Sequence, residues 1–305
     1  MHIPVLLKEV LRYLDPKPGE NFIDCTIGQG GHAFAILERI APGGRVLGID
    51  ADSQSLRILA LEQKAKNESG RLVLAEGNFM DVGSIAEKKK FVEVQGVLMD
   101  LGWSSWQMEE SGRGFSFLKD EMLDMRMSSV QTLTAEHIVN TYTEKTLAEI
   151  FEKFGEERFA KKIAKAIIEK RRLRKILRTK ELAEIVIGAI PSRFHHGRIH
   201  VSTRVFQALR IATNDELESL NKALRGAYEI LSPGGRLAVI SFHSLEDRIV
   251  KNFFREEERA GRLTILTKKP VMSSGEETAK NPRSRSAKLR AAVKTMQNTN
   301  LKMKN

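Results

Sequence analysis

The chain has 305 residues, of which 41% are hydrophobic and 29% charged, so it can bury the core of one large domain or two modest ones and is not generally disordered. Its single cysteine, Cys25, excludes an internal disulfide and zinc modules that need several cysteines, and it favours a reducing, cytoplasmic location. The formal net charge of +11 suggests a polyanionic partner, and secretion or membrane spanning is not expected because no signal peptide and no run of about eighteen apolar residues is found.

Four short apolar runs alternate with helical patterns in the N-terminal third of the chain. They cover residues 21–27, 45–50, 71–77 and 96–100. Runs of this length, bounded by glycine or charged residues and about twenty residues apart, are typical of buried parallel strands joined by crossover helices. The sequence therefore predicts an α/β fold with a doubly wound sheet.

The alternation stops after Trp103, and apolar residues then recur at helical spacing. Helices are predicted over 143–154, 156–178, 179–190 and 215–231, followed by strands over 236–244, 262–267 and 288–295. The economical interpretation is a sheet domain over 1–104 and 206–305, with a basic C-terminal tail, interrupted by an inserted helical substrate-recognition domain over 105–205.

The positive charge is concentrated in two segments. Residues 158–178 hold ten basic residues against Glu169 alone, and residues 268–305 hold ten against two acids, which leaves 30 basic and 36 acidic residues elsewhere. Clustered lysine and arginine displace the counterions of phosphates, so two such segments favour a nucleic-acid partner over a membrane. The alternative is a solvated helix plus a disordered basic tail.

A glycine-rich turn, "DCTIGQGGH" over 24–32, directly follows the first predicted strand. Glycines there permit a sharp turn and a close approach of a ligand to the backbone. Asp50 ends the second predicted strand nineteen residues after Gly31, where a carboxylate can accept hydrogen bonds from two ribose hydroxyls. The combination predicts a nucleotide-like cofactor site, although Asp50 could instead be only a helix cap.

Two cofactors compete for this site, the dinucleotide of a dehydrogenase and S-adenosylmethionine. Asp24 precedes the glycine turn, where it would repel a pyrophosphate but attract the ammonium or sulfonium group of S-adenosylmethionine. Phe79 follows the third predicted strand and can pack on an adenine ring, unless it is a core residue. Asp100 ends the fourth strand, so four strand ends supply ligands to one crevice and S-adenosylmethionine is predicted.

Nine segments carry a resemblance to a known family. They are "HIPVLLKEVL" (2–11), "IDCTIGQGGHA" (23–33), "GNFMDV" (77–82), "MDLGWSSWQM" (99–108), "RGFSF" (113–117), "LDMRM" (123–127), "TRVFQALRIATNDEL" (203–217), "LSPGGRLAVISFHSLEDRIVK" (231–251) and "NPRSRSAKLR" (281–290). Nearly end to end, the chain resembles the small-subunit ribosomal RNA methyltransferase H family, which methylates N4 of a cytidine in the decoding region of bacterial 16S rRNA. The fourth-strand motif departs from the family at Trp103 and Trp106, where valine and proline are frequent.

The resemblance implies a fold, a cofactor and a partner. The fold is a Rossmann-like, S-adenosylmethionine-dependent methyltransferase sheet with an inserted all-helical domain, and the partner is 16S rRNA or the small ribosomal subunit. The implied contacts to S-adenosylmethionine are Gly30, Gly31, His32, Asp50, Phe79, Asp100 and Gln107.

The chemistry of the target identifies a candidate catalytic residue. An exocyclic cytosine amino group is a poor nucleophile because its lone pair is delocalised into the ring, and a carboxylate that accepts an amino proton counters this. Asp100 is the candidate for that role, and His243 is a weaker one because a structural histidine is the more common case. Histidines 195, 196 and 200 lack partner cysteines at zinc spacing, so no metal site is predicted.

The function that follows is N4-methylation of a 16S rRNA cytidine by an S-adenosylmethionine-dependent enzyme. A DNA amino methyltransferase is the alternative among enzymes, since the basic segments suit either nucleic acid. A non-catalytic RNA-binding ribosome-assembly factor is the alternative outside enzymes. A nicotinamide dehydrogenase is disfavoured by Asp24 and by the absence of a second glycine-rich mononucleotide half.

Overall fold

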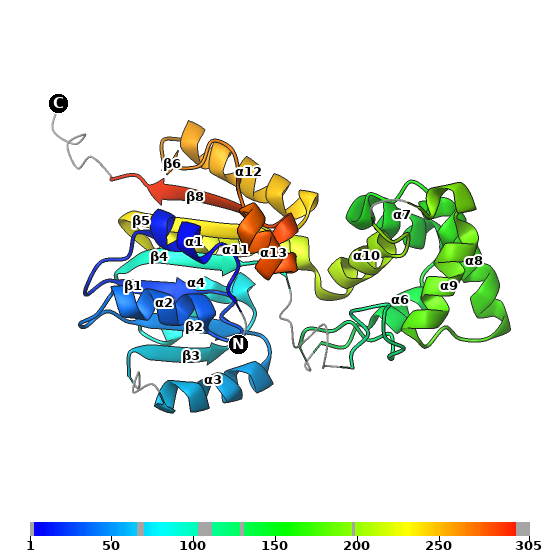
Figure 1. The fold of residues 1–305 in the computed structure, drawn as a ribbon, viewed down its shortest axis with the longest axis horizontal. Helices are drawn as coiled ribbons and strands as arrows, with labels where there is room; N and C mark the ends of the chain where they lie inside the picture. The colour runs from blue at the N-terminus through cyan, green and yellow to red at the C-terminus, as the bar shows by residue number, and fades with distance from the viewer. Residues whose placement is uncertain (1–2, 66–69, 103–111, 129–130, 197–198, 297–305) are drawn as a thin grey trace, which may run out of the picture. The chain divides into compact units, whose positions relative to one another are not determined.

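The computed structural model describes residues 3–65, 70–102, 112–128, 131–196 and 199–296. The chain divides into two compact units, which Figure 1 lets the reader follow along the chain. Residues 1–102 and 217–305 form the first, here called the sheet unit, and residues 103–216 form the second, here called the helical unit.

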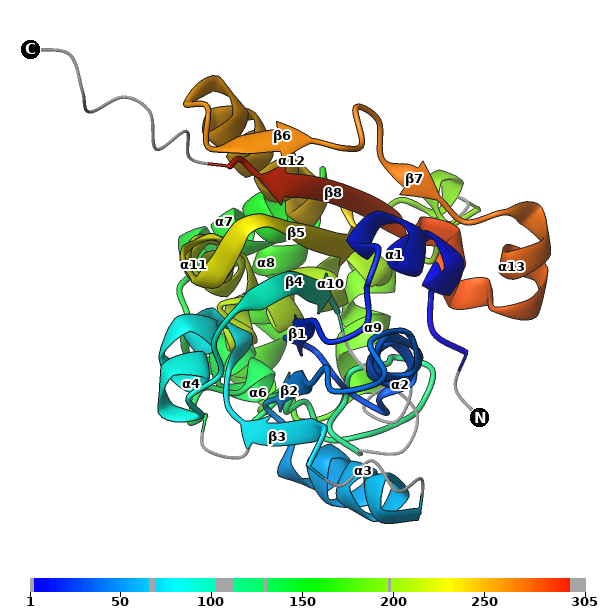
Figure 2. The same cartoon turned by 90° about the vertical axis from the view of Figure 1, so that its left-hand side faces the viewer.

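The sheet has eight strands in the order β3-β2-β1-β4-β5-β8-β6, with β7 paired to β8, and Figure 2 shows them one above another. The first five strands are parallel, whereas β8 runs antiparallel to β5, β6 and β7. Their bounds are β1 Asn21–Asp24, β2 Val46–Asp50, β3 Leu72–Glu76, β4 Val94–Asp100, β5 Leu231–Ser241, β6 Leu263–Ile265, β7 Val271–Met272 and β8 Lys288–Lys294.

Helices cover both faces of this sheet (Figure 2). One face packs on α4 (Val82–Lys88), α11 (Glu216–Ile230) and α12 (Ser244–Arg259), and the other on α1 (Leu7–Leu14), α2 (Gly31–Arg39) and α3 (Ser53–Ala65). Central strand β4 shows why a strand covered on both faces has consecutive apolar residues, here Val97, Leu98 and Met99. Val97 and Met99 enter the first core and Leu98 the second, because successive side chains of a strand alternate between faces.

The basic segment that begins at Lys268 is part of the sheet unit over its described residues, up to residue 296. It contains β7, α13 (Gly275–Lys280), the 3-10 turn η3 (Pro282–Ser286) and β8. Arg290 is 7% exposed and its Nε lies 2.6 Å from Asp247 Oδ1. The ammonium of Lys294 donates to the carbonyl oxygens of Tyr228 and Leu231 at 2.8 and 2.7 Å. The charged groups of Arg290 and Lys294 therefore stabilise the fold and do not belong to a disordered tail.

The helical unit contains α6 (Ala135–Thr141), α7 (Glu144–Gly155), α8 (Ala160–Leu173), α9 (Thr179–Ala189), η2 (Ser192–Phe194) and α10 (Thr203–Asn214). The hydroxyls of Thr134 and Thr143 accept the N–H groups of His137 and Thr146, so threonine caps set where α6 and α7 begin. The apolar stripes of these amphipathic helices meet in one core.

Helix α8 is shorter than the predicted helix over 156–178. Glu156 has φ +50°, a left-handed conformation that ends α7, and Arg174 is extended. Residue 205, where the insertion was expected to end, lies inside α10, whose Phe206 and Leu209 pack into the helical core. The helical unit therefore extends to residue 216. No helix within the described ranges is long and apolar enough to cross a bilayer.

Candidate active site

Acidic residues end three neighbouring strands of the sheet. Asp24 ends β1, Asp50 ends β2 and Asp100 ends β4. Because these strands are parallel, their carboxyl ends meet at one edge of the sheet. The chain continues from β1 to β2 on one side, while β4 lies on the other side of β1, so the site occupies the point where the strand order reverses. Ligands of open α/β sheets bind at such a point.

The turn after β1 needs its glycines for two reasons. Gly28 and Gly30 have φ of +48° and +77°, values that L side chains rarely adopt. A Cβ at Gly30 would also lie 2.7 Å from Leu59 Cδ1. At Gly31 the obstacle is a different one, since a Cβ there would lie 2.9 Å from Pro4 Cγ. The glycine turn thus places backbone without side chains next to the strand ends.

Asp50 holds this turn in place. Its Oδ2 accepts the N–H of Gly28 at 2.9 Å, and its Oδ1 accepts the N–H of Asp52 at the same distance. Burial raises the pKa of Asp50 to about 6. Each carboxylate oxygen keeps a second lone pair, so ribose hydroxyls can still donate to it. The helix cap is Asp52, which accepts the N–H of Gln54.

Asp24 and Asp100 are two acids of the site whose pKa values are raised by burial and by neighbouring acids. Asp24 is 2% exposed, and burial followed by the nearby charge of Asp50 raises its pKa to about 7. Asp100 donates its own N–H to Thr26 Oγ1 at 2.7 Å. Burial, Asp24 and Glu246 raise the pKa of Asp100 well above its ordinary value. Among the described residues nothing hydrogen-bonds Asp100 Oδ1, which is buried.

The remaining predicted cofactor residues lie around these acids. His32 is 6% exposed in the first turn of α2, with Nδ1 3.7 Å from Asp100 Oδ2. Phe79 lies in the 3-10 turn η1 (Phe79–Asp81) after β3 and packs partly against the core. Gly77 before it donates its N–H to the Asp50 carbonyl oxygen at 2.9 Å, which joins the ends of β2 and β3. Gln107, Trp103 and Trp106 lie outside the described residues.

His243 has a structural task. It caps α12, because its Nδ1 accepts the N–H of Glu246 while the Glu246 carboxylate accepts the N–H of His243, a reciprocal capping box. Sequence reasoning missed Glu246 itself. This glutamate is 3% exposed, accepts the N–H of Phe242 at 2.8 Å and acts electrostatically on Asp100. A glutamate three residues after the cap in "HSLE" is the signal that could have identified it.

These residues fit S-adenosylmethionine. The buried Asp100 Oδ1, which has no hydrogen-bond partner among the residues that the structure describes, and the buried acid Asp24 at its side are costly in the absence of positive charge. A ligand with positive sulfonium and ammonium groups pairs with these two carboxyl groups and so removes the cost of their burial. A pyrophosphate would add negative charge beside Asp24 and Asp100, so the described residues do not fit a dinucleotide.

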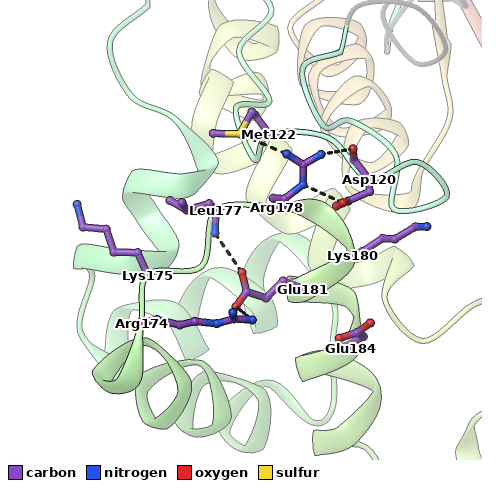
Figure 3. A pocket seen from close by; sticks show the side chains of 9 residues that line it. All are labelled: Asp120, Met122, Arg174, Lys175, Leu177, Arg178, Lys180, Glu181 and Glu184. Carbon is purple, nitrogen blue, oxygen red and sulfur yellow. Dashed lines mark hydrogen bonds and ion pairs between the residues drawn. The ribbon is translucent and has the colours of Figure 1, made fainter.

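A second feature lies in the helical unit, at the junction of α8 and α9. An open hollow of about 510 Å³ is lined by nine residues, which Figure 3 shows: Asp120, Met122, Arg174, Lys175, Leu177, Arg178, Lys180, Glu181 and Glu184. Arg178 pairs with Asp120 at 2.8 Å and Arg174 with Glu181 at 3.1 Å. Lys175 and Lys180 are exposed and lie apart from these pairs (Figure 3).

A mostly parallel, doubly wound sheet with a glycine turn and acidic strand ends defines a nucleotide-binding α/β protein of the methyltransferase type. The sequence matches the MraW methylase family over residues 1–295, so the chain belongs to that family. This membership confirms the family, the S-adenosylmethionine-dependent methyltransferase fold and the cofactor predicted from the sequence.

Curated relatives match almost the whole chain. It is 47% identical over 294 residues to ribosomal RNA small subunit methyltransferase H of Desulfotalea psychrophila and 45% identical over 309 residues to that of Heliobacterium modesticaldum, and both alignments cover 96% of this chain and 98% of the relative. Among solved structures, a SAM-dependent O-methyltransferase of Thermotoga maritima aligns with a TM-score of 0.44 and 9% identity over 97% of this chain and 68% of that one.

Proposed function

We propose that this protein transfers a methyl group from S-adenosylmethionine to N4 of a cytidine in the decoding region of bacterial 16S rRNA. The observation that carries the proposal is the match at 45–47% identity, over 96% of the chain, to relatives named ribosomal RNA small subunit methyltransferase H. The Asp100 carboxylate at the end of β4, whose Oδ1 is buried without a partner among the described residues, supports it, because amino methylation needs an acceptor for an amino proton.

Asp100 is the residue to which we assign that acceptor role. Its Oδ1, which no described residue hydrogen-bonds, can accept a hydrogen bond from the cytosine amino group, which draws the nitrogen lone pair out of conjugation with the ring. The backbone of Asp100 is held by Thr26 Oγ1, so the carboxylate is positioned before substrate arrives. S-adenosylmethionine, when bound, supplies an electrophilic methyl group.

Binding and orientation of the cofactor fall to the other strand ends. Asp50 offers oxygens to ribose hydroxyls, Phe79 offers an aromatic surface to the adenine, and the backbone of Gly30 and Gly31 permits close approach. Asp24 offers a negative charge to a cationic group of the cofactor. Positioning of the cofactor by these residues supplies much of the acceleration in this proposal.

For the helical unit we propose substrate recognition through RNA phosphates. Not all of its ten clustered basic residues can serve. Arg174 and Arg178 are paired with carboxylates, and Arg171 donates to the carbonyl oxygen of Val139 at 2.7 Å. Arg172 and Lys175 are exposed, as is Lys180 just beyond the cluster, so these three side chains are the phosphate contacts that we favour.

One experiment tests the function and separates its alternatives. The protein is incubated with labelled S-adenosylmethionine and one of three substrates: unmodified small ribosomal subunits, free 16S rRNA or DNA. The methylated nucleoside is then identified by mass spectrometry. We expect N4-methylcytidine in the rRNA. Methylated DNA would support the DNA enzyme, and tight RNA binding without any methylated product would support an assembly factor.

A further inference from the structure

Two phenylalanine rings meet in the helical unit, one from the turn before α8 and one from the 3-10 turn η2. The ring centroids of Phe159 and Phe194 are 5.1 Å apart, and their planes are inclined by 49°. Both side chains are partly buried and pack against the helical core with part of their surface. Each side chain therefore keeps another part that faces solvent.

Local hydrogen bonds fix the backbone that carries these rings. The buried Glu157 carboxylate accepts the N–H of Phe159 at 2.8 Å, which shapes the turn between α7 and α8. The N–H of Phe194 donates to the carbonyl oxygen of Pro191 at 2.9 Å, which closes η2. The aromatic pair is therefore formed before any partner arrives, and a partner does not have to order it.

Three cationic side chains lie over the two rings. The guanidinium carbon of Arg158 is 4.0 Å from the centre of the Phe194 ring and 4.8 Å from that of Phe159. The Arg193 guanidinium carbon is 4.9 Å from the Phe194 centre, and the Lys162 ammonium is 6.0 Å from the Phe159 centre. These are cation–π distances. All three cationic residues are exposed, so the guanidinium of Arg158 contacts the rings and also reaches solvent.

Within the described ranges, no carboxylate is paired with Arg158, Lys162 or Arg193. Elsewhere in the basic segment over 158–178 such pairs do occur, at Lys165, Arg174 and Arg178. The N–H donors of the three cations over the rings therefore remain available to an anion that comes from outside the protein.

We propose that the two rings and their three cations form a stacking platform for an unpaired nucleotide of a single-stranded RNA segment. The base stacks on the planar guanidinium of Arg158, and Lys162 and Arg193 bind phosphates of the same strand. The platform deepens the RNA recognition proposed above for the helical unit, and the inference rests on that proposal.

The combination of rings and cations favours this partner over others. A phosphate requires only positive charge, which exposed lysines such as Lys175 already supply. A flat cationic surface supported by aromatic rings adds a site for a base, and only an unpaired base can leave its neighbours to use it. An acidic peptide would pair with the cations but would leave the stacking surface unused. The platform lies at the start of α8, apart from the phosphate contacts favoured at its end.

The test is fluorescence anisotropy with two probes, an unstructured end-labelled single-stranded RNA of mixed sequence and the same strand paired with its complement. Arg158→Lys keeps the positive charge but removes the planar group on which a base stacks. Arg57→Lys is the matched control, because Arg57 is an exposed arginine of α3 without a ring contact among the described residues. Phe194→Leu removes one ring. Should that variant fold poorly, Arg158→Lys at an exposed position carries the test alone.

We expect Arg158→Lys to weaken binding of the single strand by roughly five- to 100-fold, with an unchanged slope of log affinity against log salt. Phe194→Leu should also weaken it without a change of slope. Affinity for the duplex should stay within about twofold of the wild type in both variants, because its bases are stacked on each other. Lys162→Gln and Arg193→Gln should each lower the slope for the single strand by about 0.7. Arg57→Lys should change none of these quantities.

Two results would overturn the proposal. One is single-strand affinity of Arg158→Lys equal to that of the wild type, and the other is an equal loss of affinity for strand and duplex. Binding is measured without methyl transfer, so the proposed function is tested separately. If Arg158→Lys behaves as expected but the wild type forms no N4-methylcytidine, the platform stands and the proposed function fails. If N4-methylcytidine is formed but Arg158→Lys binds the single strand normally, the platform fails and the proposed function stands.

Discussion

The Asp50 carboxylate accepts the backbone N–H of Gly28 at 2.9 Å. This bond ties the end of β2 to the glycine turn that follows β1, so a residue expected to bind ribose also shapes the loop beside it. The second oxygen of Asp50 accepts the N–H of Asp52. Removal of the carboxylate would therefore change both the expected ribose contact and the shape of the glycine turn.

Asp50→Ala should weaken S-adenosylmethionine binding by roughly 1 to 3 kcal/mol, the cost of leaving ribose hydroxyls without a charged acceptor. Calorimetry on the folded variant measures this. Asp81→Ala is the control, since Asp81 is an exposed acid after β3 whose side chain caps nothing in α4. Equal affinity of the two variants would confine Asp50 to a structural role.

Asp24 makes the stability of the cofactor-free protein depend on pH. Its pKa of about 7 in the fold exceeds the ordinary value near 3.9, so the folded state binds a proton more tightly than the unfolded chain does. The stability that this provides is fully present below about pH 4 and is lost as pH rises through about 7.

Asp24→Asn mimics the protonated acid and cannot ionise. The melting temperature of this variant, relative to that of the wild type, should therefore rise from about pH 5 to about pH 7 and level off above that. Thermal melts at four pH values measure the difference, which cancels the contributions of other acids such as Asp124. With saturating S-adenosylmethionine, the difference in melting temperature should depend less on pH. A difference that does not change with pH in the absence of ligand would contradict this explanation.

Asp100→Asn keeps the size of the side chain but removes the charge and weakens the acceptor. With cofactor and RNA both saturating, turnover should fall at least about tenfold beyond any loss of cofactor affinity. Single-turnover kinetics with the authentic substrate measures it. Normal turnover with poorer cofactor affinity would limit Asp100 to binding, and His243 would then be the next candidate.

Arg171 and Arg172 are adjacent in sequence but should respond differently to substitution. Arg171 donates to Val139 at 2.7 Å, and burial lowers its pKa. Arg171→Gln should cost about 1 kcal/mol of unfolding free energy, whereas Arg172→Gln at an exposed site should stay within about 0.5 kcal/mol of the wild type. Urea unfolding compares them, and similar midpoints would show that the bond to Val139 contributes little.

Replacing Arg172, Lys175 and Lys180 with glutamine should weaken RNA binding and leave cofactor binding intact. The slope of log affinity against log salt should fall by roughly 0.7 to 0.9 for each phosphate that the variant no longer binds. The matched control replaces three exposed lysines of the sheet unit, Lys8, Lys88 and Lys89. The same slope in both triple variants would leave the segment from Lys268 onward as the main RNA-binding surface.

Local patterns in the sequence were sufficient to predict several elements and their ends. Apolar runs predicted β1 to β5 because parallel strands buried on both faces have few polar residues, as Val97, Leu98 and Met99 of β4 illustrate. The same runs placed Asp50 and Asp100 at strand ends, since the carboxyl end of a run can be read directly, whereas the first run was predicted over 21–27 and β1 ends earlier, at Asp24. Residues 28 and 30 were expected in a turn and do have positive φ.

Which side chains meet could be learned only from the folded chain. Glu246 and Asp100 are far apart in the sequence. Residues 3–6 contact α13 and the residue after it, although almost the whole chain separates them in sequence. Such contacts follow from strand order and helix packing, which local spacing does not encode. For the same reason, counting basic residues could not show which of them are available to bind a partner. A sequence shows that Arg171, Arg172 and Arg290 are basic, but only the fold shows that Arg171 and Arg290 bond to other groups of the protein while Arg172 faces solvent.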